Sequence, residues 1–583
     1  MTYTAVQYEM TELTWHAPAP KGSDVDVDLR ASFTKDGRTV TVSGFYRGDD
    51  TCSVRFLPEE AGDYSYTVSG VVSESGTLSV AEAKIGSHGM VRAKGTHFQY
   101  EDGTWFYPFG TTVYALLHQQ GSLIDQTMKT LSASPFNKVR LCVFPKHYEY
   151  NHNDPEFYAF NKYKDAHHDK SMKHIWDTNH PCFAFWDRIE ARLRELGDMG
   201  IQADLILFHP YDCWGFSQLT REEALTYLDY AVRRLSAFPN LWWSLANEYD
   251  LMSCSMDDWN AIAHFIHTHD PYGHLLSNHQ IVKPWDFANE ATSHICLQLP
   301  VVDEVRDFIL KYKKPMMIDE CRYEGNLPQG WGNLSGFEMV NRFWKVVTQG
   351  GYCTHGEVFL QKTDGYRGAS ADAAAPAGGK NSSANEKPLG QTMAGKADAS
   401  FGDTPLAPDN ASDHDDEVLW WAKGGVLHGE SPARIGFLKK IVESLPGPLT
   451  YGCHVPTMEE VREMKKHAPK DVDPFSFLSA LLRMDDNGAL ALAKSGCGFE
   501  GKVYARDTES TESDDTVLAD LKYFDTQCTV IGVIDLPEDG TYDIDLIDAW
   551  NMTRHTVLRG MSGHVRVPMP GQEGMALLAL RRS

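Results

Sequence analysis

Residues 202–248 read QADLILFHPYDCWGFSQLTREEALTYLDYAVRRLSAFPNLWWSLANE, and this stretch decides the fold. It contains a short apolar run, then a segment whose apolar residues have helical spacing, then a second apolar run. A strand–helix–strand order of this kind is typical of two parallel strands, because the helix carries the chain back to the edge where the first strand began. The chain on both sides continues the same rhythm, which indicates a parallel sheet covered by helices.

Eight strand candidates lie between residues 106 and 360, and amphipathic segments separate them. The candidates are FYPFGTTVY (106–114), NKVRLCVF (137–144), QADLILF (202–208), LWWSLANE (241–248), HLLSNHQ (274–280), HICLQLP (294–300), PMMIDE (315–320) and GYCTHGEVFL (351–360). A further amphipathic segment, ARIGFLKKIVESL (433–445), follows the eighth candidate. Eight strands with eight returns predict an α/β fold of the (β/α)8 TIM-barrel type over residues 88–452.

The barrel is expected to be flanked by two β-sandwiches. Residues 1–85 contain short β-rich runs broken by turns, and PEEAGDYSYTV (58–68) resembles the last hairpin of immunoglobulin-like domains, where a tyrosine packs across the corner. Residues 455–583 are strand-rich again and predict the second sandwich. Residues 362–416 interrupt the barrel as a low-complexity insertion that is too poor in apolar residues to pack a core.

Composition excludes several functional classes. The 583 residues are 42% hydrophobic, which supports packed cores, and the formal charge of −26 disfavours nucleic acids and anionic membranes as partners. The eleven cysteines are scattered without a C-x-x-C pair, so a reducing compartment is the simpler interpretation. The amino terminus has no leader pattern and no run is long enough to span a bilayer, so we expect a cytoplasmic protein.

Functional residues of a TIM barrel lie at the carboxyl ends of its strands, and this rule selects a small set here. The set contains Tyr114, His118, Arg140, Lys146, His209, Asn247, Glu248, His279, Gln298, Glu320, His355 and Glu357. Two carboxylates stand out, Glu248 and Glu320, because each ends an apolar strand where an unpaired acid is costly to bury. Paired acids across a barrel mouth are what glycoside hydrolysis needs, since one protonates the leaving oxygen and the other attacks the anomeric carbon.

The Asn-Glu pair after strand four and the second Glu after strand seven resemble the retaining glycoside hydrolases of the four-over-seven superfamily, also called clan A. The resemblance implies that Glu248 is the general acid/base, that Asn247 binds the sugar 2-hydroxyl and that Glu320 is the nucleophile. Arg140 matches a strand-two arginine that steadies the nucleophile. The segments SHGMVRAKGTHFQYEDGTWFYPFGTTVY (87–114) and WWAKGGVLHGESPARIGFLKKI (420–441) are similar to the apiosidase-like branch, whose members often carry an N-terminal sandwich and a C-terminal β domain of the collagen-binding type.

The sequence also departs from the clan pattern. Strand six ends in Gln298 where many clan members place a tyrosine that touches the nucleophile, and strand eight lacks the frequent sugar-stacking tryptophan. Trp420 and Trp421 could supply the missing stacking surface, because aromatic faces suit the apolar faces of sugar rings. His209 and His279 are either packed histidines or sugar contacts. Asp319 or Glu324 is the alternative to Glu320, and only one of Asp319 and Glu320 should point into the mouth, because neighbouring strand residues face opposite sides.

These observations predict a glycoside hydrolase that cleaves a terminal sugar from an oligosaccharide or plant glycoside with retention, with a furanoside or pentoside as the first candidate. The alternative is a non-catalytic carbohydrate-binding protein on the same scaffold. Five histidines between residues 147 and 174 lack zinc spacing, and no nucleotide-binding motif is present, so neither a metal nor a cofactor is expected. The N-terminal sandwich either mediates homo-oligomer formation or walls the cleft.

Overall fold

The structure is a computed structural model of the whole chain. It describes residues 1–148, 151, 154–164, 166, 170–360, 419–451, 499–505 and 516–582. The predicted insertion at 362–416, the strand candidates at 475–484 and 489–495, and His152, His167 and His168 lie outside the described residues. The described chain divides into two compact units, one formed by residues 1–300, 312–335 and 354–429 and one formed by residues 301–311, 336–353 and 430–583.

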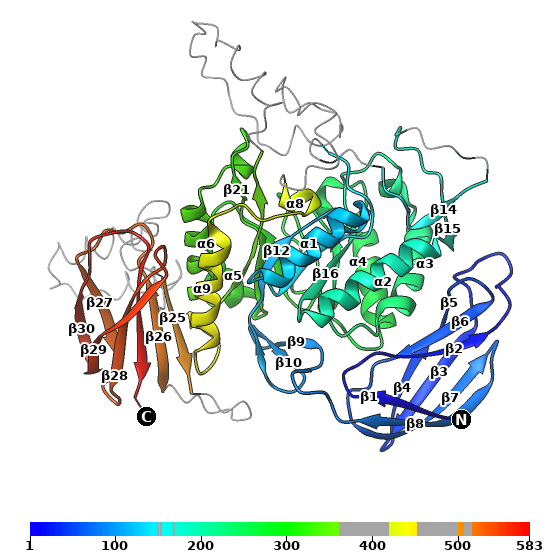
Figure 1. Cartoon of the computed structure of the whole chain (residues 1–583), viewed down its shortest axis with the longest axis horizontal. Helices are drawn as coiled ribbons and strands as arrows, with labels where there is room; N and C mark the ends of the chain where they lie inside the picture. The colour runs from blue at the N-terminus through cyan, green and yellow to red at the C-terminus, as the bar shows by residue number, and fades with distance from the viewer. Residues whose placement is uncertain are drawn as a thin grey trace, which may run out of the picture. The chain divides into compact units, whose positions relative to one another are not determined.

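The amino-terminal region is a β-sandwich, as predicted, and its strands β1 to β8 are drawn in blue in Figure 1. One sheet has the order β1 (Thr2–Val6), β8 (Glu74–Ala81), β7 (Gly62–Gly70), β3 (Leu29–Lys35) and β4 (Arg38–Ser43), and the other has the order β2 (Thr11–His16), β6 (Thr51–Phe56) and β5 (Phe45–Tyr46). Phe33 and Phe56 join the sheets with stacked rings 4.1 Å apart. The hydroxyl of Tyr64 donates to the carbonyl of Glu60 at 3.0 Å, which is the corner contact expected from the sequence.

A buried ion network holds the sandwich to helix α2 (Phe183–Asp198). The Arg55 guanidinium of β6 donates to both oxygens of Glu190 on α2, at 2.8 and 2.7 Å, and to Glu12 at 2.6 Å. Burial alone would raise the pKa of Glu190, but the two neighbouring guanidinium groups of Arg55 and Arg234 outweigh it and hold that pKa at about 2. The paired charges therefore fix the sandwich to this side of the barrel.

The eight-stranded sheet confirms the predicted TIM barrel. The strands are β12 (Phe109–Thr112), β13 (Lys138–Cys142), β16 (Gln202–Phe208), β17 (Leu241–Ala246), β18 (Leu276–Ser277), β19 (Ile295–Gln298), β20 (Met316–Glu320) and β22 (Tyr352–His355). Their order is β18-β17-β16-β13-β12-β22-β20-β19. The ends of this order meet through hydrogen bonds outside the ladder, because the Ser293 amide donates to the Leu276 carbonyl at 2.8 Å and the Ser277 hydroxyl to the His294 carbonyl at 2.7 Å.

Helices follow the strands at the positions that the amphipathic segments predict. Besides α2 they are α1 (Gly121–Ala133), α3 (Arg221–Leu235) and α4 (Met256–His269), and the shorter elements are η1 (Leu116–His118), η2 (Phe216–Gln218), η3 (Tyr249–Leu251), η4 (Gly330–Gly332) and α8 (Trp420–Lys423). Capping boxes formed by Thr220 with Glu223 and by Ser255 with Asp258 start α3 and α4. None of the helices in the described ranges is long and apolar enough to cross a membrane.

Short pairs of strands complete this unit. They are the meander β9 (Val91–Lys94), β10 (His97–Tyr100) and β11 (Trp105–Phe106), the pair β14 (Phe160–Lys162) and β15 (Trp176–Pro181), and the parallel pair β21 (Glu324–Gly325) and β23 (Glu357–Val358). The eighth strand candidate of the sequence is thus split into β22 and β23. The break places Gly356 against the ring of Tyr323, where a Cβ atom would have no room.

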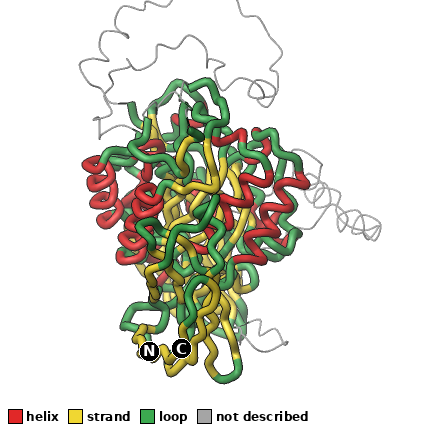
Figure 2. The backbone as a smooth tube through the Cα atoms, turned by 90° about the vertical axis from the view of Figure 1, so that its right-hand side faces the viewer, coloured by secondary structure: helices red, strands yellow, loops and turns green. Residues whose placement is uncertain are grey.

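The second unit contains α5 (Val305–Tyr312), α6 (Gly336–Thr348), α9 (Ser431–Glu443) and a β-rich carboxyl-terminal region. One sheet has the order β24 (Thr450–Tyr451), β25 (Phe499–Tyr504), β26 (Val517–Tyr523), β31 (Met575–Arg581), β28 (Tyr542–Asp548) and β29 (Thr553–Met561), and β27 (Ile531–Leu536) pairs with β30 (Gly563–Pro568). Tyr523 stacks on Trp344 of α6 and donates to Asn341 at 2.8 Å. The parts next to both chain ends consist of strands and loops (Figure 2).

Candidate active site

The two predicted carboxylates lie at the carboxyl ends of β17 and β20. Glu248 follows β17 by two residues and is 4% exposed, and Glu320 is the last residue of β20 and is 7% exposed. The two acids lie close together, because the negative charge of Glu320 is the largest cause, after burial, of a raised pKa at Glu248. The fold therefore brings together two acids that are separated by 71 residues in the sequence.

A tyrosine and an arginine surround Glu320. The hydroxyl of Tyr114, which follows β12, donates to Glu320 Oε1. Arg140 Nη1, on β13, lies 3.7 Å from the same oxygen and provides a compensating positive charge. The tyrosine that contacts Glu320 therefore follows strand one, and strand six ends in Gln298.

A β-bulge places Asp319 and Glu320 in different surroundings. Leu297 pairs with Ile318 and the next residue, Gln298, pairs with Glu320, so Asp319 is the extra residue on β20. Beside the bulge, Arg140 lies 4.0 Å from Asp319 as well as 3.7 Å from Glu320, so one arginine is near both acids.

Asp319 belongs to an ion network inside the barrel. Lys138 Nζ donates to Asp319 at 2.8 Å and to Asp204 at 2.6 Å, and Thr354 donates to Asp319 at 2.6 Å. Burial opposes the charge on Asp319, but Lys138 and Arg140 outweigh it and hold the pKa of this carboxyl well below its usual range. Lys138 is thus paired with Asp319, whereas Glu320 receives the hydrogen bond of Tyr114.

Glu248 occupies an unusual backbone conformation and a different electrostatic environment. Its φ is 52°, in the left-handed region that non-glycine residues adopt at a cost of ~1–3 kcal/mol and that is enriched at functional sites. The Tyr211 hydroxyl donates to its Oε2. Burial, followed by the charge of Glu320, raises the pKa of Glu248 to about 7, whereas Lys146 and the Tyr211 hydrogen bond lower it. A carboxyl in this environment can hold a proton near neutral pH.

Asn247 offers a free donor beside the two acids. Its Oδ1 lies 2.9 Å from the Tyr114 hydroxyl, and Arg140 donates to it at 3.5 Å. Its Nδ2 is buried and has no hydrogen-bond partner among the described residues. A buried amide donor without a partner is unfavourable unless a ligand satisfies it, so this group can bind a sugar hydroxyl.

His279 connects the two carboxylate positions. Its Nδ1 accepts the backbone N–H of Glu248 at 3.3 Å, so its Nε2 carries the proton of the neutral ring. That Nε2 lies 3.8 Å from Glu320 Oε1. Burial lowers the pKa of His279 well below its usual value, which keeps the imidazole neutral. His279 is therefore a neutral donor beside Glu320 as well as a packed histidine.

Lys146 lies in the site, at a position between two tyrosine rings that the sequence did not predict. Its Nζ lies 3.5 Å from the ring centroid of Tyr114 and 4.2 Å from that of Tyr211. Burial lowers the pKa of Lys146, while Cys142, Glu248 and Glu320 oppose this effect. A lysine in a loop after strand two carries no spacing signal, whereas its position between the rings of two site tyrosines is evident in three dimensions.

The remaining predicted residues divide between the site and the core. The Trp421 ring lies 6.1 Å from that of Tyr114 and 5.5 Å from that of Tyr323, so it forms an aromatic wall next to the tyrosine that contacts Glu320. The Trp420 indole, which is 1% exposed, instead donates to the Thr111 hydroxyl at 2.8 Å. Trp421 is thus the better placed of the two tryptophans for sugar stacking.

His209 and Gln298 each have one buried polar side-chain atom without a hydrogen-bond partner among the described residues. His209 Nε2 lies 3.1 Å from the carbonyl of Phe144, and its Nδ1 has no partner among the described residues. Burial lowers the pKa of His209 to about 3. Gln298 accepts from Gln280 through its backbone carbonyl at 3.2 Å, and its side-chain oxygen has no partner within the described ranges. Their role in substrate binding stays a prediction.

Comparison with known families and structures agrees with this geometry. Residues 92–358 match the family model for the apiosidase-like catalytic domain. Residues 4–70 and 510–579 match two domains of unknown function, DUF5060 and DUF5605. No curated protein matches the chain.

Solved structures extend the similarity over the whole chain. A crystal structure from Bacteroides vulgatus ATCC 8482, described as a candidate glycoside hydrolase, has 27% identity and a TM-score of 0.75, with 100% of both chains covered. A glycoside hydrolase of family 5 from the same organism has 13% identity and a TM-score of 0.51, covering 85% of this chain and 94% of that chain, and shares the fold. The barrel fold, its paired acids and these matches define a glycoside hydrolase. Its barrel is similar to the apiosidase-like catalytic domain over residues 92–358.

Proposed function

We propose that this glycoside hydrolase removes a terminal sugar from an oligosaccharide or plant glycoside by double displacement with net retention. In the proposed mechanism Glu320 is the nucleophile and Glu248 is the general acid/base. The apiosidase-like domain makes a furanoside or pentoside the first substrate class to test. The free cysteines of the described chain agree with a reducing, cytoplasmic location.

The unequal environments of the two acids carry this proposal. Glu320 has a cation, Arg140, 3.7 Å away and receives a hydrogen bond from Tyr114. Glu248 is buried, and burial together with the charge of Glu320 raises its pKa to about 7. A charged acid beside an acid that retains its proton near pH 7 is the pairing that retaining hydrolysis requires.

The steps follow from these positions. Glu320 attacks the anomeric carbon while Glu248 transfers its proton to the leaving oxygen, which forms a covalent glycosyl-enzyme and releases the aglycone. Glu248, now ionised, removes a proton from water, and the resulting hydroxide displaces Glu320 from the sugar. The unpartnered Nδ2 of Asn247 is available to donate to a sugar hydroxyl throughout.

Hydrolysis of a substrate panel tests the proposal. The panel contains nitrophenyl furanosides and pyranosides and apiosylated flavonoids, and Glu320→Gln and Glu248→Gln are compared with the wild type and with the exposed control Glu222→Gln. We expect release of one terminal sugar, with a loss of at least ~10³ in rate for Glu320→Gln.

Two further measurements define the mechanism. NMR of the first-formed product should show the starting anomeric configuration. Azide should give a glycosyl azide of retained configuration with Glu248→Ala and of inverted configuration with Glu320→Ala. An inverted product from the wild type would refute double displacement. Sugar binding without turnover in the wild type would instead favour a carbohydrate-binding protein.

A further inference from the structure

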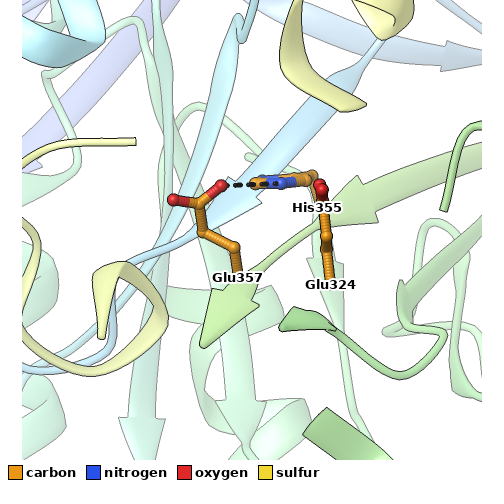
Figure 3. A group of neighbouring side chains, drawn as sticks. All are labelled: Glu324, His355 and Glu357. Carbon is orange, nitrogen blue, oxygen red and sulfur yellow. Dashed lines mark ion pairs between the residues drawn. The ribbon is translucent and has the colours of Figure 1, made fainter. Parts of the chain in front are cut away.

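A second cluster of ionisable side chains lies where β21 and β23 run side by side. Glu324 begins β21 and Glu357 begins β23, and the two residues are direct partners in this parallel pair. His355 ends β22, two residues before Glu357. The three side chains are at most 2% exposed, and one ligand atom from each lies within 4.8 Å of the others (Figure 3).

Two acids in this arrangement repel each other. Like charges opposite each other on neighbouring strands are destabilising, and burial increases the cost. Glu357 receives the backbone N–H of Gly429 at 2.8 Å and that of His428, but no lysine or arginine of the described chain is paired with it. A positive charge between the two acids would relieve this repulsion.

His355 provides an independent reason to expect a ligand. Its Nε2 is buried, has no hydrogen-bond partner among the described residues and lies 3.8 Å from Glu357 Oε2, as the dashed line in Figure 3 shows. Its Nδ1 lies 3.2 Å from the Thr111 hydroxyl, and its ring stacks on Phe136 at 4.8 Å. With Nδ1 beside the Thr111 hydroxyl, Nε2 is the nitrogen left to act as a ligand.

The cluster has room for a small ion and lies close to the surface. Oε2 of Glu324 and Oε2 of Glu357 both approach Gly429 so closely that a Cβ atom at that position would collide with them. Gly429 is partly exposed and His428 is exposed, so the cluster lies just beneath the surface. The glycine therefore leaves the two carboxylate oxygens room to converge at a point that an ion can reach.

We propose that Glu324, His355 and Glu357 bind one divalent transition-metal cation, with water completing its coordination. One imidazole nitrogen and two carboxylate oxygens suit Zn²⁺ or Mn²⁺ better than Ca²⁺ or Mg²⁺, which prefer oxygen ligands alone. Thr111 would hold the imidazole in the binding tautomer, as outer hydrogen bonds do in metal sites. No metal motif is visible in the sequence, because Glu324 lies 31 residues before His355.

The proposed ion would stabilise the loop after β20. Glu324 follows Glu320 by four residues, and Tyr323 between them packs against the Trp421 wall. Joining β21 to β23 through a cation would fix this loop relative to strand eight. The role is structural, and it is independent of the reaction assigned to Glu248 and Glu320.

Direct metal binding tests the proposal. The full chain is dialysed against a chelator, and then Zn²⁺, Mn²⁺ and Ca²⁺ are added separately during calorimetry and thermal unfolding. We expect one equivalent of Zn²⁺ or Mn²⁺ per chain, a higher Tm with the ion present and weaker binding of Ca²⁺. Glu357→Gln and His355→Gln should each weaken binding at least ~100-fold, and the exposed control His264→Asn should leave it unchanged.

Thr111→Val serves as a second test if a ligand variant fails to fold. It keeps the side-chain shape, removes the hydroxyl beside His355 and should weaken metal binding about 10- to 100-fold. The electron paramagnetic resonance spectrum of bound Mn²⁺ should differ between the wild type and each folded variant. Binding below one tenth of an equivalent, or equal affinity in wild type and Glu357→Gln, would overturn the proposal and leave a proton shared by the two acids as the explanation.

Discussion

The proton on Glu248 should set the alkaline limit of activity. Burial and the charge of Glu320 raise its pKa from 4.5 to about 7. At pH 7 such a group is about half protonated, whereas a group titrating at 4.5 would be about 0.3% protonated, so the shift increases the active form about 150-fold. Because the general acid must be protonated, activity is present below this pKa and is lost as the pH rises through it.

The assay is kcat/KM between pH 5 and pH 9 for two substrates that share a sugar. One carries an alkyl leaving group, whose departure needs protonation of its oxygen. The other carries a nitrophenyl leaving group, which departs with little or no protonation. The kcat/KM of the alkyl glycoside should fall about tenfold between pH 6 and pH 8, because the protonated fraction of Glu248 falls from about 91% to about 9%. The nitrophenyl glycoside should change much less. An alkaline limb near pH 4.5, or equal limbs for both substrates, would refute the assignment of Glu248.

Three other predictions follow from the same contacts. Tyr114→Phe removes the hydroxyl that donates to Glu320. Because hydrogen bonds to charged groups contribute ~1.5–3 kcal/mol, kcat/KM should fall about 10- to 150-fold while the circular dichroism spectrum stays unchanged. A loss below twofold would contradict this prediction. Lys138→Met leaves Asp204 and Asp319 buried without their cation and should destabilise the protein by ~3–5 kcal/mol in urea unfolding, whereas the exposed Lys129→Met should not. Glu248→Gln should be more stable than the wild type at pH 8, by up to about 3 kcal/mol, and equal to it at pH 4. The pKa of Glu248 is higher in the folded than in the unfolded protein, so the contribution of this carboxyl to the free energy of unfolding is lost as the pH rises from 4.5 through about 7. Identical plots of stability against pH for the variant and the wild type would contradict this prediction.

The sequence predicted the barrel well because apolar strands at the centre of a parallel sheet leave a strong signal. LWWSLA and MMIDE were found at β17 and β20, and the positions of Asn247, Glu248 and Glu320 followed from the rule that strand ends carry function. The eighth candidate strand was predicted as one run, but Gly356 divides it into β22 and β23. Periodicity cannot reveal such a break, because the residues on both sides of Gly356 are buried alike.

Contacts between distant segments were beyond the reach of the sequence. Tyr114 was recognised as a strand-end residue, but its hydrogen bond to Glu320 depends on two segments about 200 residues apart. Lys146 lies in a loop, and Tyr211 reaches Glu248 from the loop after strand three. Loops follow the packing around them rather than a periodic pattern, so their side chains could be placed only in three dimensions.

The extra residue on β20 affects how related sequences and variant libraries should be read. An ungapped alignment through this strand can set Asp319 opposite the nucleophile of a relative whose strand lacks the bulge, so the gap belongs beside Glu320. In a library scored by activity alone, Asp319 variants will resemble loss of the nucleophile, because Lys138 and Arg140 would lose a shared anionic partner. Scoring the amount of folded protein alongside turnover separates these cases, since only Glu320 variants should remain abundant and inactive.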